Sequence, residues 1–218
     1  MGFPTVLASL LYPPVCPLCR SGGSDHEAGP LCHSCRTRLE PDGPPDRSQR
    51  GVRLSGAPWR YTGALTQAVR QFKYHRRWRI GRWLAGDMEA LVRRAFPLDD
   101  IDLIVPMPSH WLRRRLRGFD APGELARALS RRLGKRCDPR LLRRPRRTAS
   151  QTRLPWPKRL RNVEGAFTAR PRLAAQRAVL LVDDVLTSGA TARAAALALR
   201  QAGARAVYVV TAARTPSA

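Results

Sequence analysis

The pattern of hydrophobic and polar positions changes its period along the chain, and each period predicts a different kind of element. Apolar residues at helical spacing predict four helices, over residues 65–74, 83–96, 122–133 and 191–202, and Gly203 ends the last of them. Short apolar runs predict three buried strands, over residues 101–105, 177–182 and 206–211. Residues 52–61 are expected to form a short hairpin. Strands that alternate with helices indicate a mostly parallel sheet.

A different pattern occupies the first forty residues, where cysteines come in two pairs. Cys16 and Cys19 form one C-x-x-C pair, and Cys32 and Cys35 form a second after twelve intervening residues. Four thiolates at this spacing can surround one Zn²⁺ ion tetrahedrally, and a closed site of this kind has a structural role. Free thiols or redox pairs are the alternative. His26 and His33 could compete as ligands, although four cysteines already complete the site.

The remaining cysteine, Cys137, has no partner at such a spacing and is expected to be a buried apolar filler. Residues 40–50 are rich in proline and glycine and are expected to be a linker. The predicted organisation is therefore a zinc-binding module over residues 1–39, a linker over 40–50 and an α/β domain over 51–218.

The strand predicted over residues 177–182 leads into Asp183 and Asp184, then a short turn and a helix. Anions bind well at helix N-termini, where unpaired N–H groups and the helix dipole converge. Gly189 would let the backbone approach a phosphate, and hydroxyl donors come from Thr187, Ser188 and Thr191. The acids would face sugar hydroxyls or a metal. The alternative is an ordinary strand end with a capped helix, but buried carboxylates without a partner are costly.

Charge changes the picture further, because 40 basic residues face only 16 acids and the formal net charge is +24. Residues 111–161 contain 18 Lys or Arg and three acids, a net charge of +15. Codon bias in a GC-rich genome would explain why the bases are mostly arginine, but not their excess over acids. Such a stretch attracts polyanions, so nucleic acid, phosphorylated metabolites or an anionic membrane surface are candidate partners. Trp111 and Trp156 could stack on bases or belong to the core.

The segment from Asp183 to Thr191 resembles the phosphoribosyl pyrophosphate signature of type I phosphoribosyltransferases. Together with the cysteine module, the order of further matches resembles the ComF family of competence proteins over nearly the whole chain. Those matches are Phe72-Lys73-Tyr74, Val105-Pro-Met-Pro108, Arg115-Leu-Arg-Gly-Phe119, Gln151 and Arg161-Asn162-Val-Glu-Gly-Ala-Phe167. The departures are His75-Arg76-Arg77, where a small or glycine-containing turn is usual, and Thr152-Arg153 after Gln151.

The resemblance implies an α/β fold, type I phosphoribosyltransferase-like, with a mostly parallel sheet flanked by helices and a small N-terminal zinc-ribbon-like module. It implies that Asp183 and Asp184 contact ribose hydroxyls and that Thr187 to Thr191, with Ala190 among them, hold the 5-phosphate. Pro106 and Met107 take the place of the pyrophosphate-binding loop. Lys73 is a candidate phosphate contact.

Arginines before Phe119 are candidates for a mobile lid. Arg115 and Arg117 could close over pyrophosphate oxygens, with Gly118 as a hinge, or form a solvated basic face. Mg²⁺ would accompany the ligand and neutralise the charge of leaving pyrophosphate. Catalytic residues and an acceptor are not evident. Glutamine-dependent amide transfer is not expected, because residue 2 is Gly and Cys16 and Cys19 belong to the metal site.

Three hypotheses about function follow. One is a Mg²⁺-dependent phosphoribosyltransferase with an unknown acceptor. The favoured one is a protein that responds to phosphoribosyl pyrophosphate and handles single-stranded DNA during uptake, with a competence helicase as a candidate partner. A transcriptional regulator is the weakest, because no helix-turn-helix is evident. Residues 3–15 are apolar but lack the features of a signal peptide, so a short helix and a cytoplasmic location are expected.

Overall fold

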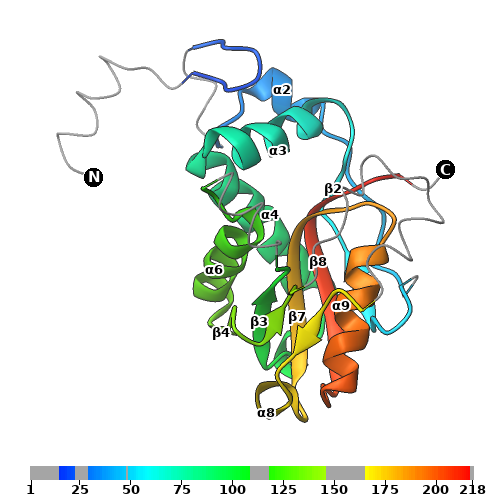
Figure 1. The fold of residues 1–218 in the computed structure, drawn as a ribbon. Helices are drawn as coiled ribbons and strands as arrows, with labels where there is room; N and C mark the ends of the chain where they lie inside the picture. Colours follow the sequence, from blue (N-terminus) through cyan, green and yellow to red (C-terminus); the bar gives the residue numbers. More distant parts are fainter. Residues whose placement is uncertain (1–14, 23–28, 48, 109–117, 146–164, 217–218) are drawn as a thin grey trace.

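The computed structural model describes residues 15–22, 29–47, 49–108, 118–145 and 165–216. At its centre is a parallel sheet in the order β1-β8-β7-β3-β4, and β2 also pairs with β8 (Figure 1). Its strands are β1 (Leu54–Gly56), β2 (Trp59–Arg60), β3 (Leu103–Pro106), β4 (Arg136–Cys137), β7 (Ala178–Leu186) and β8 (Ala206–Arg214). A short antiparallel pair, β5 (Leu142–Arg143) and β6 (Thr168–Ala169), lies apart from this sheet.

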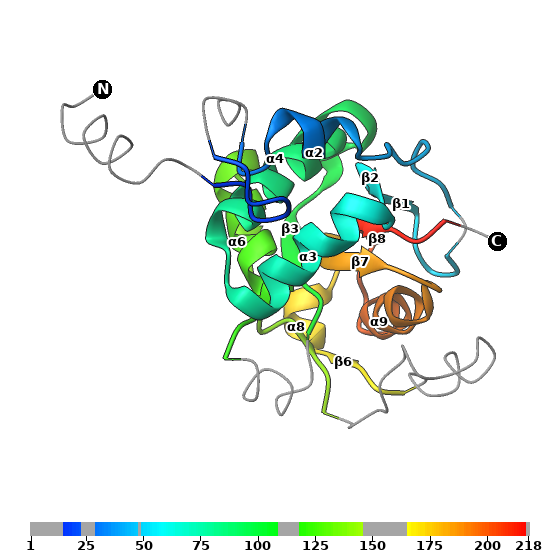
Figure 2. The ribbon, with the colours of Figure 1, turned by 90° about the horizontal axis from the view of Figure 1, so that it is seen from above.

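Helices cover both faces of the sheet, as parallel sheets require (Figure 2). One face carries α3 (Gly63–His75), α4 (Trp78–Ala95) and α6 (Ala121–Leu133), and the other carries α9 (Ala190–Gln201). The shorter helical segments are α2 (His33–Thr37), η2 (Leu98–Asp100) and α8 (Pro171–Ala174). Alternate residues of β7 divide between two cores: Leu180 and Val182 pack with α3, α4 and α6, whereas Val179 and Leu181 pack with α9.

The predicted fold class is confirmed, because the sheet is parallel, flanked by helices and preceded by the four-cysteine module. The element boundaries differ most in two places. The helix predicted to begin at residue 83 begins at Trp78, and the strand predicted to end at residue 182 continues through both acids to Leu186.

The hairpin predicted over residues 52–61 is wrong. Both short strands pair with β8 in parallel, with Leu54 opposite Tyr208 and Trp59 opposite Ala213. The nine-residue β8 is long enough to accept two short strands in succession along one edge. Pro58 stands between them and has no backbone N–H to donate.

The segment expected to be a linker runs along this edge of the sheet. The N–H of Asp42 donates to the Pro58 carbonyl at 3.1 Å, and Asp46 and Ser55 exchange backbone hydrogen bonds at 2.8 and 2.9 Å. Arg214, at the end of β8, forms ion pairs with Asp42 at 3.3 Å and with Asp46. Residues 40–46 are therefore held against the α/β domain.

No helix in the described part of the chain is long and apolar enough to cross a bilayer. The short helix expected near the start of the chain lies outside the described residues, apart from Val15.

Candidate functional site: an acid pair and a turn at the end of β7

The two acids of the candidate site lie near the carboxyl end of β7, in the middle of the sheet. Asp183 is opposite Thr211 of β8, and both acids are half-buried. The N–H of Asp184 donates to Oδ1 of Asp183 at 2.8 Å. Ligands of open α/β sheets bind beyond the carboxyl ends of the strands, so the pair occupies a position suited to ligand binding.

Lys73 links α3 to this pair. Its Nζ lies 2.7 Å from Oδ1 of Asp184. Burial alone would lower the pKa of Lys73, but the charge and hydrogen bond of Asp184 outweigh it and leave the pKa raised. Burial, together with the neighbouring Asp184 charge, raises the pKa of Asp183 to about 8. In this state one acid of the pair is ion-paired with Lys73, and the other keeps its proton near neutral pH.

The turn after β7 ends in Gly189, the residue that caps α9. Gly189 has φ of 70°, a left-handed conformation that a side chain would strain. Thr187 is exposed, whereas Ser188 is half-buried and its Oγ has no hydrogen-bond partner among the described residues. Ala190 is buried and Thr191 half-buried in the first turn of α9, which contains no acid to compete with an anion. The turn therefore combines the N–H groups of a helix N-terminus with the Ser188 hydroxyl, which has no hydrogen-bond partner among the described residues.

The end of β3 lies directly beside the acids. Pro106 is opposite Val182, and the N–H of Met107 donates to the Val182 carbonyl at 2.8 Å. Met107 is buried against the α9 side of the sheet. The structure therefore brings the residues predicted to replace a pyrophosphate loop next to the acid pair.

The two candidate lid residues, Arg115 and Arg117, lie outside the described residues, as do Trp111, Gln151 and Trp156. The described end of that segment is anchored: the Phe119 ring contacts Phe72 and Trp78 edge-on, each at 5.1 Å between centroids. Arg76 ends α3 in a left-handed conformation with φ of 51°. It belongs to the segment in which the family resemblance leads one to expect a small or glycine-containing turn, and glycine is the residue that adopts this conformation most readily. Its guanidinium lies against Gly118.

Two residues near the site were missed by the sequence reasoning. The charge of Arg144 counteracts the raised pKa of Asp183, and its guanidinium lies 5.1 Å from the centroid of Phe167. No sequence feature separates Arg144 from the neighbouring arginines. The carboxamide of Gln49 lies where a Cβ of Gly189 would stand, so it covers one side of the turn. No local motif marks Gln49, because only the tertiary fold brings it to α9.

The four paired cysteines converge in a module that packs against α3 and α4. All four Sγ atoms lie within 4.8 Å of one another, and those of Cys19 and Cys32 are 3.5 Å apart. A tetrahedral zinc site with Zn–S bonds of about 2.3 Å separates its sulfurs by about 3.8 Å, so the cluster fits one ion. Cys16, Cys32 and Cys35 are buried, as a closed structural site requires. Cys137 is half-buried in β4 and packs against the core formed with α3, α4 and α6.

Residues 7–55 match the family model of the double zinc ribbon domain. The fold and the cysteine cluster thus define a zinc-ribbon protein built on a parallel α/β sheet. The chain is 37% identical over 153 residues to the DNA utilization protein YhgH of Escherichia coli K12, and 36% identical over 156 residues to that of Salmonella typhi. It is 30% identical over 154 residues to competence protein F of Haemophilus influenzae.

These alignments cover 68% of this chain, and 66% of the YhgH and 67% of the competence protein F sequences. The chain therefore belongs to the competence protein F family, and it spans about two thirds of the length of these relatives.

Two solved structures are more distantly similar. Glutamine phosphoribosylpyrophosphate amidotransferase from B. subtilis, complexed with ADP and GMP, matches with a TM-score of 0.44 and 19% identity, over 65% of this chain and 30% of that one. The protein TT1426 from Thermus thermophilus matches with a TM-score of 0.38 and 18% identity, over 63% and 84%. Similarity at this distance assigns no ligand.

Proposed function

We propose that the protein binds phosphoribosyl pyrophosphate with Mg²⁺ at the end of β7 and acts in DNA uptake by contacting single-stranded DNA. The observation that carries the ligand assignment is the acid pair followed by a left-handed Gly189 at the start of α9. Carboxylates accept hydrogen bonds from vicinal sugar hydroxyls, while the turn and helix N-terminus favour a phosphate. One ligand with both groups satisfies both halves of the site.

Asp183 and Asp184 are also the oxygen donors that Mg²⁺ prefers, and Mg²⁺ commonly binds through one or two carboxylates and substrate phosphates. The ion would screen the pyrophosphate charge. Lys73 already neutralises Asp184 and would remain near the bound phosphates. Arg144, whose charge acts on Asp183, would add a guanidinium to the site. The predicted lid arginines were expected to play the same role.

The ligand proposal is tested by thermal shift with phosphoribosyl pyrophosphate and Mg²⁺. At a hundredfold excess over the dissociation constant the stabilisation is about 2.7 kcal/mol. Asp183→Asn with Asp184→Asn should abolish the shift, because the sugar contacts are lost. Since the variant also leaves Lys73 unpaired, each protein is compared with its own ligand-free melting temperature. The matched control is Asp99→Asn, which replaces an exposed acid that is distant in the sequence from Asp183 and Asp184. An undiminished shift in the double variant would reject the site.

An active phosphoribosyltransferase is the second candidate function. It is favoured by the position of Pro106 and Met107, which border the acid pair where a leaving pyrophosphate would lie. Release of pyrophosphate that depends on an added base or amine would support this candidate. Release that is the same with and without acceptors would argue against it.

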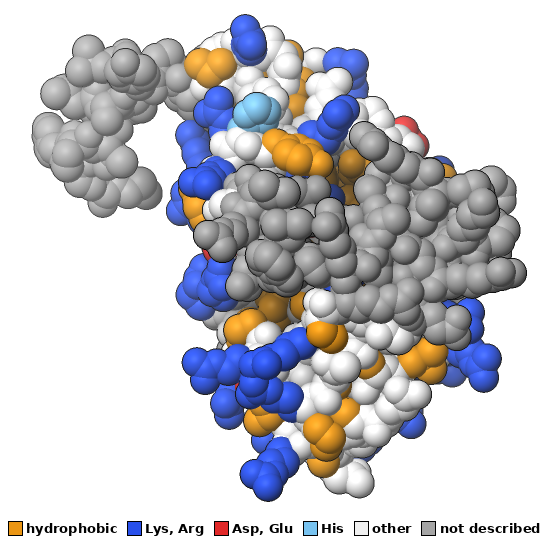
Figure 3. Space-filling model, in the orientation of Figure 1, with side chains coloured by type: hydrophobic (Ala, Val, Ile, Leu, Met, Phe, Trp, Pro, Cys, Tyr) orange, Lys and Arg blue, Asp and Glu red, His pale blue; other side chains and the backbone are white. Residues whose placement is uncertain are grey.

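The DNA part of the proposal is supported by the net charge of +24 and by family membership, since relatives carry the names DNA utilization protein and competence protein. Basic side chains spread over the side of the molecule that α4 and α6 form, with few acids among them (Figure 3). Binding should show little sequence preference and should weaken steeply with salt, because phosphate contacts release counterions. Absence of binding at low salt would reject this part and leave the ligand assignment standing.

The predicted basic segment, residues 111–161, is described only over residues 118–145. Within it, Arg144 lies close enough to Asp183 to influence its pKa. An experiment on the segment should therefore replace Arg143, Arg146 and Arg147 and leave Arg144 intact, so that a loss of DNA binding is not confused with damage to the acid site.

A further inference from the structure

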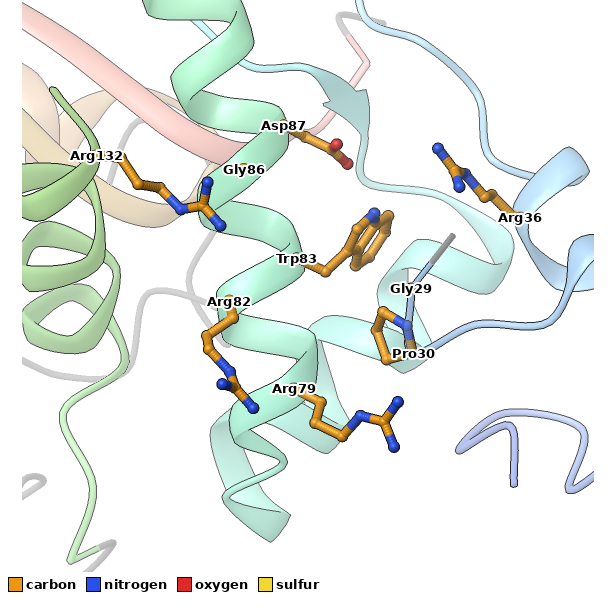
Figure 4. A pocket seen from close by; sticks show the side chains of 9 residues that line it. All are labelled: Gly29, Pro30, Arg36, Arg79, Arg82, Trp83, Gly86, Asp87 and Arg132. Atoms are coloured by element: carbon orange, nitrogen blue, oxygen red, sulfur yellow. The ribbon is translucent and has the colours of Figure 1, made fainter. Parts of the chain in front are cut away.

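A basic groove lies on the surface where the cysteine module meets α4 and α6 (Figure 4). Its volume is about 370 Å³ and it is open to solvent. The residues that line it come from three parts of the chain: Gly29, Pro30 and Arg36; Arg79, Arg82, Trp83, Gly86 and Asp87 of α4; and Arg132 of α6. This set is called the arginine groove below.

The groove holds an excess of positive charge that its own contacts do not neutralise. Asp87 is the one acid of the lining, and its Oδ2 accepts a hydrogen bond from Trp59 Nε1 at 2.8 Å. Arg132 is paired with Glu89 at 2.9 Å. Arg79 and Arg82 are exposed and have no ion pair within the described residues. Two guanidinium groups therefore remain available to anions.

An aromatic ring lies at the centre of these charges. Trp83 is half-buried, and its indole is flanked in Figure 4 by Arg79 and Arg82 on one side and by Asp87 and Arg36 on another. Trp59 packs behind it, with 6.4 Å between ring centroids and 34° between planes. The edge of the indole also lies close to the backbone at Gly29, because a Cβ added to Gly29 would stand 3.5 Å from the Trp83 ring. These contacts already hold the Trp83 ring in place. A ligand that stacks on the ring would therefore cost little further side-chain entropy.

We propose that the arginine groove is the surface that binds single-stranded DNA, with a base stacked on Trp83 and phosphates at Arg79 and Arg82. A fixed aromatic ring between unpaired guanidinium groups suits a strand, because bases stack and phosphates pair in alternation. An open groove favours a chain over an enclosed small molecule. The basic surface continues along α4, where Arg93 donates to the Arg132 carbonyl at 2.7 Å. The proposal rests on the DNA contact proposed above but places it away from residues 111–161.

The test is fluorescence anisotropy of a labelled oligothymidylate, titrated with the zinc-loaded 218-residue chain at several salt concentrations. Arg79→Gln with Arg82→Gln should weaken binding about tenfold or more at low salt. It should also flatten the slope of log K against log salt by about 1.4, which is about 0.7 for each of two contacts. Trp83→Leu should weaken binding by about 5- to 150-fold through lost stacking. Melting temperature and zinc content verify that each variant is folded.

The matched control is Arg172→Gln with Arg177→Gln, which removes the same charge from exposed positions at and after α8, at the far end of the sheet. Equal weakening by this control and by the groove variant would overturn the proposal, because only total charge would then matter. So would loss confined to Arg143→Gln, Arg146→Gln and Arg147→Gln.

Two further results would overturn it. Competition by thymidine monophosphate as strong as by the oligonucleotide, at equal phosphate concentration, would identify a mononucleotide pocket instead of a strand site. Failure of the unaltered protein to bind the oligonucleotide would remove the DNA contact altogether. The phosphoribosyl pyrophosphate thermal shift is measured on the same samples, so failure of the groove is distinguished from failure of the acid site.

Discussion

Asp183 illustrates how a single residue can keep a proton that water would remove. Its pKa is raised to about 8 by burial and by the neighbouring Asp184, against an ordinary value near 3.9. Between about pH 4 and pH 8 the folded chain therefore binds more protons here than the unfolded chain. The free energy of unfolding must fall as the pH rises through this window, and the full penalty is reached above pH 8.

Asp183→Asn should consequently stabilise the ligand-free protein, by an amount that grows from near zero at pH 4 to on the order of 1–3 kcal/mol above pH 8. The reason is that asparagine resembles the protonated acid in shape but cannot ionise. Urea denaturation at pH 5 and pH 8.5 measures the difference, with Asp99→Asn as an exposed control. A constant difference at the two pH values would contradict the raised pKa.

At the scale of elements, helices α3 and α4 pack closely because a glycine stands at their contact. A Cβ at Gly81 would overlap the ring of Phe72, which is fully buried. Gly86, five residues further along α4, has space: the nearest atom to its Cβ position is 3.8 Å away, in the Arg132 guanidinium. An added Cβ would therefore clash at Gly81 and fit at Gly86, although both residues belong to α4.

Gly81→Ala should destabilise the protein by about 1–3 kcal/mol, because overpacking a core outweighs the gain in helix propensity. Gly86→Ala should be neutral or stabilise by up to about 1 kcal/mol, since alanine restricts the unfolded chain and favours the helix. Chemical denaturation of both variants gives the comparison. Equal effects from the two substitutions would show that the α3–α4 contact tolerates a Cβ.

For the whole molecule, the cysteine module and the sheet share one core. Cys16, Cys32 and Cys35 belong to the same buried cluster as Phe72 of α3 and Leu84 of α4. Residues 40–46 add hydrogen bonds and ion pairs to the edge of β8. Loss of the metal is therefore expected to affect more than the residues that bind it.

One Zn²⁺ per chain is expected by elemental analysis of native protein. Cys16→Ser should lose the metal and lower the melting temperature of the whole chain, because three thiols cannot close the site and the shared core loosens. The phosphoribosyl pyrophosphate shift should persist, since β7 and Lys73 hold the acid pair within the α/β domain. Cys137→Ser, which removes a cysteine outside the cluster, should retain the metal. Metal-free native protein would reject the site.

Features that depend on residues close together in the chain could be predicted from the sequence alone. Helical periodicity, short apolar runs and the paired cysteines each depend on neighbours within a few residues, so they predicted the helices, the main strands and the cysteine module. The order of strand, acids, glycine turn and helix was predicted for the same reason, although β7 continues through the acids to Leu186 before the turn begins.

Which distant residues meet is settled by the folded chain and not by any local pattern. The hairpin predicted over residues 52–61 is wrong because both short strands pair with the long edge of β8. The pattern of residues 52–61 contains no information about that edge. Arg144 and Gln49 reach the acid site from segments with no motif of their own. Arg36, Trp83 and Arg132 line one groove because the fold brings residues of α2, α4 and α6 together there. Contacts between residues far apart in the chain arise from packing of the core, and local sequence preferences do not encode them.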